Sequence, residues 1–222
     1  MTPHQKKERT KRIAAIHKRL TKEFGAPKIA LRYTTDYELL IAVILSAQCT
    51  DVRVNMVTEQ LFKKYTTIND YADADQAEFE QDIYQTGFYR AKAKNIITTA
   101  KKIRDDFGGA VPRTMEELLT LPGVARKTAN VVLSNAFGVN EGIAVDTHVR
   151  RFAIRFDLSD YTDPVRIERD LMEIVPRQNW NTITYLLIEY GREICPARKH
   201  DCTDHPLTTI YPPAADVWPK AK

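Results

Sequence analysis

The sequence predicts an all-α protein, and two observations lead to this prediction. Apolar residues recur at intervals of three or four along most of the 222-residue chain, which is the spacing of a helix that buries one face. The alternation of apolar and polar residues that is typical of a half-buried strand never extends over more than a few residues. Capping residues, glycines and prolines interrupt the helical pattern, so we expect a series of short helices.

Seven helices are expected in the first 137 residues. In the first, Ile13, Ile16 and Leu20 lie at helical spacing before a stop at Gly25. Asp36 can cap the second, whose apolar run indicates burial on most sides. The expected ranges are 8–24, a segment from 36 through the apolar run 39–45, 51–64, 75 to about 87, 89–107, 114–120 and 126–137.

Three further helices are expected at 147–156, 164–175 and 179–193. The middle one begins with an Asp-Pro pair, and proline suits the first helical position because its missing N–H would have no partner there. The remaining tail, from Cys195 to Lys222, contains prolines and has no regular pattern.

The composition limits the classes of protein that need to be considered. A hydrophobic content of 43% is enough for a real core, and a net charge of +4 permits nucleic-acid binding without establishing it. The longest apolar run, 39–47, is far shorter than the ~20 residues of a membrane span. Three cysteines are an odd number, which argues against a disulfide scaffold and predicts a reducing compartment, the cytoplasm by default.

Two short segments contain the residues that suggest chemistry. The segment LPGVARKTA, 121–129, has the pattern of a tight hairpin that opens a helix, with Lys127 in the first turn. Backbone N–H groups at such a position can bind a phosphate, and the positive end of the helix dipole disfavours a protonated amine, as a nucleophile requires. Asp146, in VDTH, can accept the proton of the amine or face a cationic transition state. Together these groups suggest covalent chemistry on a nucleic-acid sugar.

Five segments, in order along the chain, resemble those of the helix-hairpin-helix DNA glycosylases, and endonuclease III most closely. They are LLIAVILSAQCTD (39–51), GFYRAKAKNI (87–96), LPGVARKTANVVL (121–133), AVDTHVRR (144–151) and CPARKHDC (195–202). The resemblance implies two all-α domains that flank a DNA-binding cleft: a six-helix barrel at 31–137, and a discontinuous domain made of 1–30 and 138–222. It also implies a monomer that acts on double-stranded DNA containing damaged bases or abasic sites, without a membrane partner.

The resemblance implies an activity and its catalytic residues. The family removes damaged, mainly oxidised, pyrimidines and then cleaves the strand by β-elimination, so it acts as both a glycosylase and an abasic-site lyase. Lys127 matches the nucleophile that forms a Schiff base at C1′, and Asp146 matches the catalytic aspartate. A solvated lysine and an ordinary helix cap are the structural alternatives for these two residues.

Further positions match the family's DNA contacts. The hairpin and helix start would bind a phosphate, through residues Leu121, Gly123, Ala125, Arg126 and Thr128. Ala125 stands where the family usually has glycine, and it would be strained if the hairpin needed a positive φ. Gln48 and Phe88 match residues that fill the space left by the extruded base. The alternative for Phe88 is a place in the core.

Asp51 and His148 are the candidates for the base pocket. Asp51 matches a polar residue that lines the pocket in the family, and its alternative is a helix cap. His148 lies beside Asp146 in sequence, and its alternative is a structural hydrogen bond that positions the loop.

The cysteine pattern of the family is degraded in this chain. The resemblance implies a four-iron four-sulfur cluster on cysteines spaced C-x6-C-x2-C-x5-C, and Cys195 and Cys202 fit its first spacing. His205 and Tyr211 stand at the third and fourth positions. Since such clusters prefer four thiolates, we expect the cluster, and any other cofactor, to be absent.

Two alternatives for the tail remain open. Cys195, His200, Cys202 and His205 are the right types of ligand for zinc, although their spacing is not a common zinc pattern. Otherwise the cysteines are relics, and packing of the tail replaces the cluster. The residues expected to pack are Ile210, Tyr211, Val217 and Trp218.

Two other functions remain as alternatives. The first is a glycosylase for another lesion, such as mismatched thymine or uracil. The second is a helix-hairpin-helix module that binds DNA without catalysis, although binding alone needs neither Lys127 nor Asp146.

Overall fold

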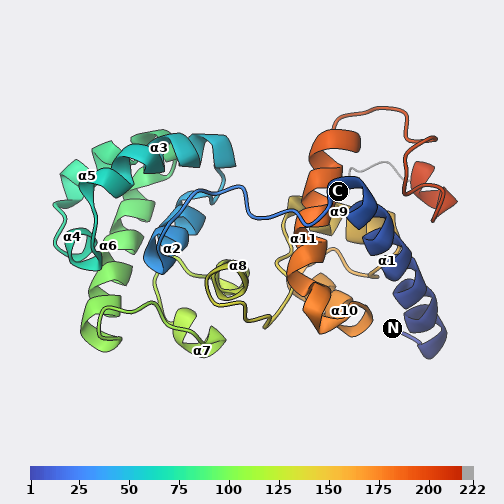
Figure 1. The fold of residues 1–222 in the computed structure, drawn as a ribbon, viewed down its shortest axis with the longest axis horizontal. Coiled ribbons are helices and arrows are strands. Elements are labelled where there is room, and N and C mark those ends of the chain that lie inside the picture. The colour runs from blue at the N-terminus through green and yellow to red at the C-terminus, as the bar shows by residue number, and fades with distance from the viewer. Residues whose placement is uncertain (217–222) are drawn as a thin grey trace. The chain divides into compact units, whose positions relative to one another are not determined.

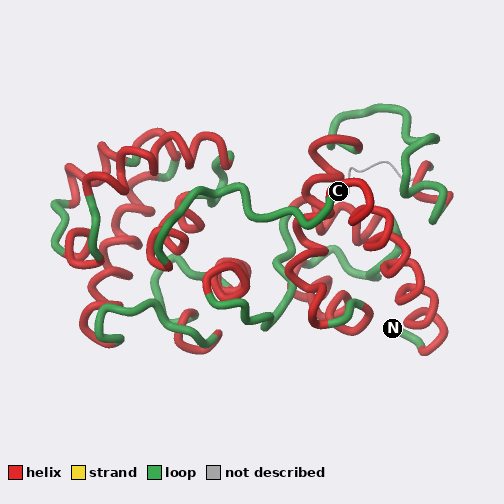
Figure 2. The backbone as a smooth tube through the Cα atoms, in the orientation of Figure 1, coloured by secondary structure: helices red, strands yellow, loops and turns green. Residues whose placement is uncertain are grey.

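The computed structural model describes residues 1–216, and within this range it contains helices, turns and loops but no strand (Figure 2). The prediction of an all-α protein is therefore confirmed. No helix among the described residues is long and apolar enough to cross a membrane.

The chain forms two compact units. The central unit runs from Ala30 to Glu141, and the terminal unit joins residues 1–29 to the described chain from Gly142 onward. The segment expected to form the barrel, 31–137, lies within the central unit.

The central unit is built around α2, whose residues from Glu38 to Leu45 are all buried. This helix contacts α3, α6 and α8, while α4 and α5 pack against α6 (Figure 1). Burial on all sides explains why its sequence is almost continuously apolar. The helices of the unit are α2 (Asp36–Leu45), α3 (Asp51–Lys64), α4 (Ile68–Ala72), α5 (Gln76–Asp82), η1 (Tyr84–Thr86), α6 (Tyr89–Asp106), α7 (Met115–Leu118) and α8 (Arg126–Ala136).

At the starts of α2 and α3, threonines are the caps in place of the aspartates considered in the sequence analysis. The Thr35 hydroxyl accepts a hydrogen bond from the backbone N–H of Glu38, and the Thr50 hydroxyl caps α3 in the same way. The predicted cap at Asp36 is therefore wrong, and so is the alternative of Asp51 as a cap. Both aspartates occupy the first helical position instead, where a negative charge faces the positive end of the helix dipole.

Helix α4 was not predicted from the sequence, and the following helix ends earlier than expected. Helix α4 has only five residues, too few to show a period, but Thr67 and Asp70 form a capping box at its start. Asp75 caps α5 as predicted, yet α5 ends at Asp82 and the chain continues as the 3₁₀ turn η1.

The terminal unit packs α1 against α10 and α11 (Figure 1). Its helices are α1 (Pro3–Phe24), α9 (Thr147–Arg155), α10 (Pro164–Ile174), η2 (Arg177–Asn179), α11 (Trp180–Glu189), the π-helix η3 (Tyr190–Ile194) and η4 (Pro212–Ala215). Helix α1 starts five residues earlier than predicted, because Thr2, just ahead of Pro3, is the N-cap and forms a capping box with Gln5.

A buried arginine connects α1 to the loop after α9. The side chain of Arg9 is almost fully buried, and its guanidinium donates hydrogen bonds to the carboxylates of Asp157 and Asp160, at 2.6 Å each. A buried charge must be paired, and these two carboxylates allow Arg9 to lie on the buried face of α1.

Part of the tail packs as expected. Ile210 and Tyr211 lie against the core of the terminal unit, and the Arg12 guanidinium lies 4.0 Å from the centre of the Tyr211 ring. Val217 and Trp218, which were also expected to pack, lie outside the described residues.

Candidate functional site

The hairpin at 121–125 is a tight turn held against α6. The backbone N–H of Val124 donates to the carbonyl of Leu121 at 3.1 Å, and Gly123 adopts φ +77°. A side chain at position 123 would be strained at this angle and would meet the Asn95 side chain at 3.0 Å. The Thr99 hydroxyl donates to the carbonyl of Pro122 at 2.8 Å, which anchors the turn.

The start of α8 has no side-chain cap within the described chain, unlike the starts of α3, α9 and α10. Its N-cap residue, Ala125, has φ −92° and ψ 170°, an ordinary extended conformation, so alanine fits without strain. The side chain of Leu121 is buried, whereas Gly123 and Ala125 are exposed. A helix start without a side-chain cap can bind an anion through the N–H groups of its first turn.

Lys127 is the second residue of α8, and it is exposed. Arg126 and Thr128, on either side of it, are half-buried. A lysine in this position can approach a sugar whose phosphate sits on the helix start.

The two residues expected to fill the space left by an extruded base, Gln48 and Phe88, are called the wedge residues below. They share an unusual backbone conformation. Gln48 has φ +53° and Phe88 has φ +48°, both in the left-handed region that non-glycine residues rarely adopt. Both side chains are exposed, and that of Phe88 is 65% exposed. The alternative of a core position for Phe88 is therefore wrong. Strained residues that project into solvent are common at functional sites.

A buried lysine connects the two turns that hold the wedge residues Gln48 and Phe88. Lys92 is only 5% exposed, and its ammonium group donates to the carbonyls of Leu45 at 2.7 Å and Thr86 at 2.8 Å. Leu45 ends α2 three residues before Gln48, and Thr86 ends η1 two residues before Phe88. Burial lowers the pKa of Lys92.

Lys92 was missed in the sequence analysis, although a signal was present. It lies four residues before Ile96, on the apolar stripe of α6 that also includes Ala93 and Ile97. A lysine on the buried stripe of an amphipathic helix is a candidate for a structural or functional role.

Asp146 caps α9. Its carboxylate accepts a hydrogen bond from the backbone N–H of Val149 at 2.8 Å, and the residue is half-buried. The cap fixes one carboxylate oxygen at the helix start, which confirms the alternative of a helix cap for Asp146. It does not conflict with a catalytic role.

His148 packs against the π-helix η3. A side chain on Gly191 would collide with the His148 Nδ1 atom, so only glycine fits at position 191. Burial lowers the pKa of His148, and the Arg151 guanidinium lies 3.5 Å from its Nδ1 atom. These contacts are those of a residue that positions the start of α9. Asp51, the other pocket candidate, is half-buried at the start of α3.

The candidate residues are divided between the two units. The hairpin, Lys127, the wedge residues and Asp51 belong to the central unit, whereas Asp146 and His148 belong to the terminal unit.

A family model described as "HhH-GPD superfamily base excision DNA repair protein" matches residues 41–177, which include the hairpin, Lys127 and Asp146. The chain belongs to this superfamily. Within it, the chain is 50% identical to the endonuclease III of Synechocystis over 94% of both chains, and 46% identical to that of Bacillus subtilis over 84% of this chain and 85% of that one. It therefore belongs to the endonuclease III family.

Solved structures of the endonuclease III family have the same fold. A non-covalent endonuclease III–DNA complex has a TM-score of 0.88 at 42% identity, covering 93% of this chain and 97% of that chain. A trapped endonuclease III–DNA covalent intermediate has a TM-score of 0.86 at 43% identity, covering 90% and 94%. A thermostable thymine-DNA glycosylase is more distant, with a TM-score of 0.77 at 25% identity, covering 92% and 95%.

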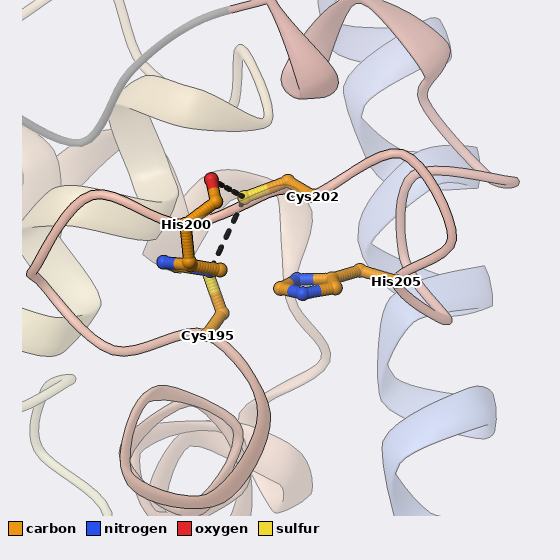
Figure 3. A group of neighbouring side chains, drawn as sticks. All are labelled: Cys195, His200, Cys202 and His205. Atoms are coloured by element: carbon orange, nitrogen blue, oxygen red, sulfur yellow. Dashed lines mark hydrogen bonds between the residues drawn. The ribbon is translucent and has the colours of Figure 1, made fainter.

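The tail of this protein contains a group of four neighbouring side chains that could hold a metal ion (Figure 3). The donor atoms of Cys195, His200, Cys202 and His205 all lie within 4.8 Å of one another. Both cysteines are buried and both histidines are half-buried. The expectation of a protein without any metal is therefore not confirmed, since the structure gathers a set of side chains that could hold one.

These residues do not fit the four-iron cluster of the family. Tyr211, at the fourth cysteine position, offers no thiolate, and its ring packs against the core with the Arg12 guanidinium 4.0 Å from its centre. The group takes His200 instead, which leaves two thiols where a cluster prefers four thiolates.

Proposed function

We propose that this protein is a bifunctional DNA glycosylase and abasic-site lyase of base excision repair that removes damaged pyrimidines. The observation that carries the proposal is an exposed lysine, Lys127, in the first turn of a helix with no side-chain cap, directly after a tight hairpin. Its relatives are named endonuclease III, and one related structure is titled a trapped covalent intermediate with DNA.

The covalent chemistry is assigned to Lys127. The neutral amine attacks C1′ of the damaged nucleotide, and the bond from C1′ to the base breaks so that the base leaves. The C1′–O4′ bond then breaks as the nitrogen loses a proton and O4′ gains one, which opens the sugar ring and gives the Schiff base. Loss of a proton from C2′ then expels the 3′ phosphate by β-elimination. Asp146 accepts the proton of the amine or stabilises the positive charge that develops on the sugar.

The other candidates hold the substrate in place. Gly123, Ala125 and the first turn of α8 bind a phosphate through backbone N–H groups, which carries no sequence information. Phe88 and Gln48 occupy the space left in the duplex by the extruded nucleotide, because C1′ cannot be reached inside the stack. Asp51 contacts the extruded base, and His148 supports the start of α9.

The domain arrangement and the setting of the reaction are part of the same proposal. Residues 31–137 form the barrel domain, and 1–30 with 138–222 form the second domain. The protein acts as a monomer on double-stranded DNA in the nucleoid of the cytoplasm. We further propose that it works without the four-iron cluster, which is supported by the two histidines among the four ligands.

Borohydride trapping tests the proposal. Borohydride reduces the Schiff base to a stable amine, so wild-type protein should become cross-linked to duplexes that contain an oxidised pyrimidine. Lys127→Gln should lose all cross-linking while binding the duplex almost as tightly, and Lys127→Arg, which keeps the cation, should lose it too. Lys7→Gln, a change of an exposed lysine on α1, is the matched control.

The same assay separates the alternatives. Trapping of Lys127→Gln at the wild-type rate would mean that another amine is the nucleophile. Trapping only on duplexes with mismatched thymine or uracil would favour the alternative substrate, and binding without trapping on any lesion would favour the non-catalytic module.

A further inference from the structure

Four potential ligands converge in the loop that follows η3. Cys195 comes directly after this π-helix, and His200, Cys202 and His205 follow within ten residues. Figure 3 shows their side chains pointing toward a common point. The Nε2 atom of His200 lies 3.2 Å from the Sγ atom of Cys202, and the two imidazole rings stack with their centres 5.0 Å apart.

The spacing of the donor atoms suits one ion. The ligands of a tetrahedral zinc ion, at 2.0–2.3 Å from the metal, stand about 3.3–3.8 Å apart. The donors of this group lie within 4.8 Å of one another, so side-chain movements of about 1 Å complete the site. The thiolates of a four-iron cluster bind four different irons and stand further apart.

The ligand types also favour zinc. Two thiolates and two imidazoles form one of the common sets for structural zinc, and together they balance its double positive charge. All four positions are filled by protein side chains, which leaves no open position for water or substrate. The site is therefore structural rather than catalytic.

Neighbouring groups orient the ligands from outside. The Nδ1 atom of His200 donates to the carbonyl of Arg198 at 2.7 Å, which makes Nε2, on the side of the Cys202 Sγ atom, the nitrogen that would bind a metal. The Nδ1 atom of His205 lies 3.4 Å from the Tyr190 hydroxyl. The Arg155 guanidinium donates to the Sγ atom of Cys195 at 2.8 Å and to the carbonyl of Ala214 at 2.7 Å. Such outer contacts are typical of metal sites, and here they orient three of the four ligands.

From this geometry we infer that Cys195, His200, Cys202 and His205 bind a single structural Zn²⁺ ion in place of the cluster of the family. The ion cross-links the loop 195–205. Through Arg155, the last residue of α9, it also supports the helix that Asp146 caps. This inference does not depend on the proposed enzymatic activity, because the metal is counted in the absence of DNA.

Metal analysis of the full-length protein is the first test. Protein purified from medium that contains both iron and zinc should hold about one zinc and almost no iron per chain. Cys202→Ser and His205→Ala should each lose most of the zinc and melt at a lower temperature. Cys49→Ser, which changes the one cysteine of the central unit, should keep the full zinc content.

A cobalt titration tests the site even if the variants fail to fold. Wild-type protein, stripped of metal with a chelator, should bind one Co²⁺ and develop the visible absorption of a tetrahedral site with two sulfur ligands. Zinc should then displace the cobalt.

Three results would overturn the inference. They are about four irons per chain, no bound metal and no tetrahedral cobalt spectrum, and a disulfide between Cys195 and Cys202. In denaturant without reductant, the disulfide would leave one free thiol instead of three.

Discussion

At the scale of single residues, one substitution can separate the capping role of Asp146 from its proposed catalytic role. Asp146→Asn keeps the oxygen that accepts from the N–H of Val149, so α9 should stay capped and the melting temperature should hardly change. The loss of the negative charge should slow base excision by roughly 100-fold or more. Single-turnover excision, followed by gel, measures the effect.

Asp163→Asn, which changes the cap of α10, is the matched control and should keep full activity. Near-normal excision by Asp146→Asn would reduce this residue to a structural cap.

Phe88 is also tested at the residue scale. Because its side chain is 65% exposed, Phe88→Ala removes little from the core and should leave the melting temperature unchanged. It should slow excision more on duplex DNA than on a lesion that is already unpaired, since a wedge offsets a few kcal/mol of unstacking. The ratio of the two excision rates is the measurement.

Leu119→Ala, another change of an exposed apolar residue, serves as the control. An equal loss of excision on both DNA substrates, or a large fall in melting temperature, would contradict the assignment of Phe88 as a wedge.

At the scale of elements, Lys92 holds the ends of α2 and η1 together. Lys92→Met keeps the apolar stem but leaves two buried carbonyls without a donor, which should destabilise the protein by roughly 1–3 kcal/mol. If Lys92 positions both wedge turns, the variant should also show the selective loss on duplex DNA expected for Phe88→Ala. Urea unfolding and the two excision rates measure these effects.

Lys94→Met, on the exposed face of the same helix, should show neither effect. If Lys92→Met loses stability but slows excision equally on paired and unpaired lesions, Lys92 supports the fold without positioning the wedge residues.

At the scale of the whole molecule, the ion pairs of Arg9 connect segments about 150 residues apart. The hydrogen bond from Arg9 lowers the pKa of Asp160 below its usual value near 3.9. The pair therefore stabilises the folded state at neutral pH, and this contribution is lost as the pH falls below about 4. Since the Asp160 side chain is about half exposed, the contribution should be about 1 kcal/mol or less.

Urea unfolding at several pH values tests this linkage. Asp160→Asn should be less stable than wild type at pH 7, and the difference should shrink below about pH 4. Asp216→Asn is the control, as this aspartate is exposed near the end of the described chain. A difference that stays constant down to pH 3 would rule out the charge of Asp160 as its cause.

Local patterns in the sequence determined most of the elements and part of the site. Helical spacing, caps and stops predicted most of the helices, because these signals depend on neighbours within four residues. The same local logic predicted the hairpin and the place of Lys127 at the start of a helix. It failed at α4, whose five residues are too few to show a period.

Only the tertiary structure decided which side chains from distant segments meet. The burial of Lys92, the exposure of Phe88 and the pairing of Arg9 with Asp157 and Asp160 all depend on segments that are distant in sequence. The group of Cys195, His200, Cys202 and His205 could not be recognised from sequence spacing either, although it lies within one short loop. Its spacing matches no common zinc pattern, yet the turns after η3 bring all four donors together. Spacing in the sequence gives the separation of ligands along the chain, whereas metal binding depends on where their donor atoms lie in space.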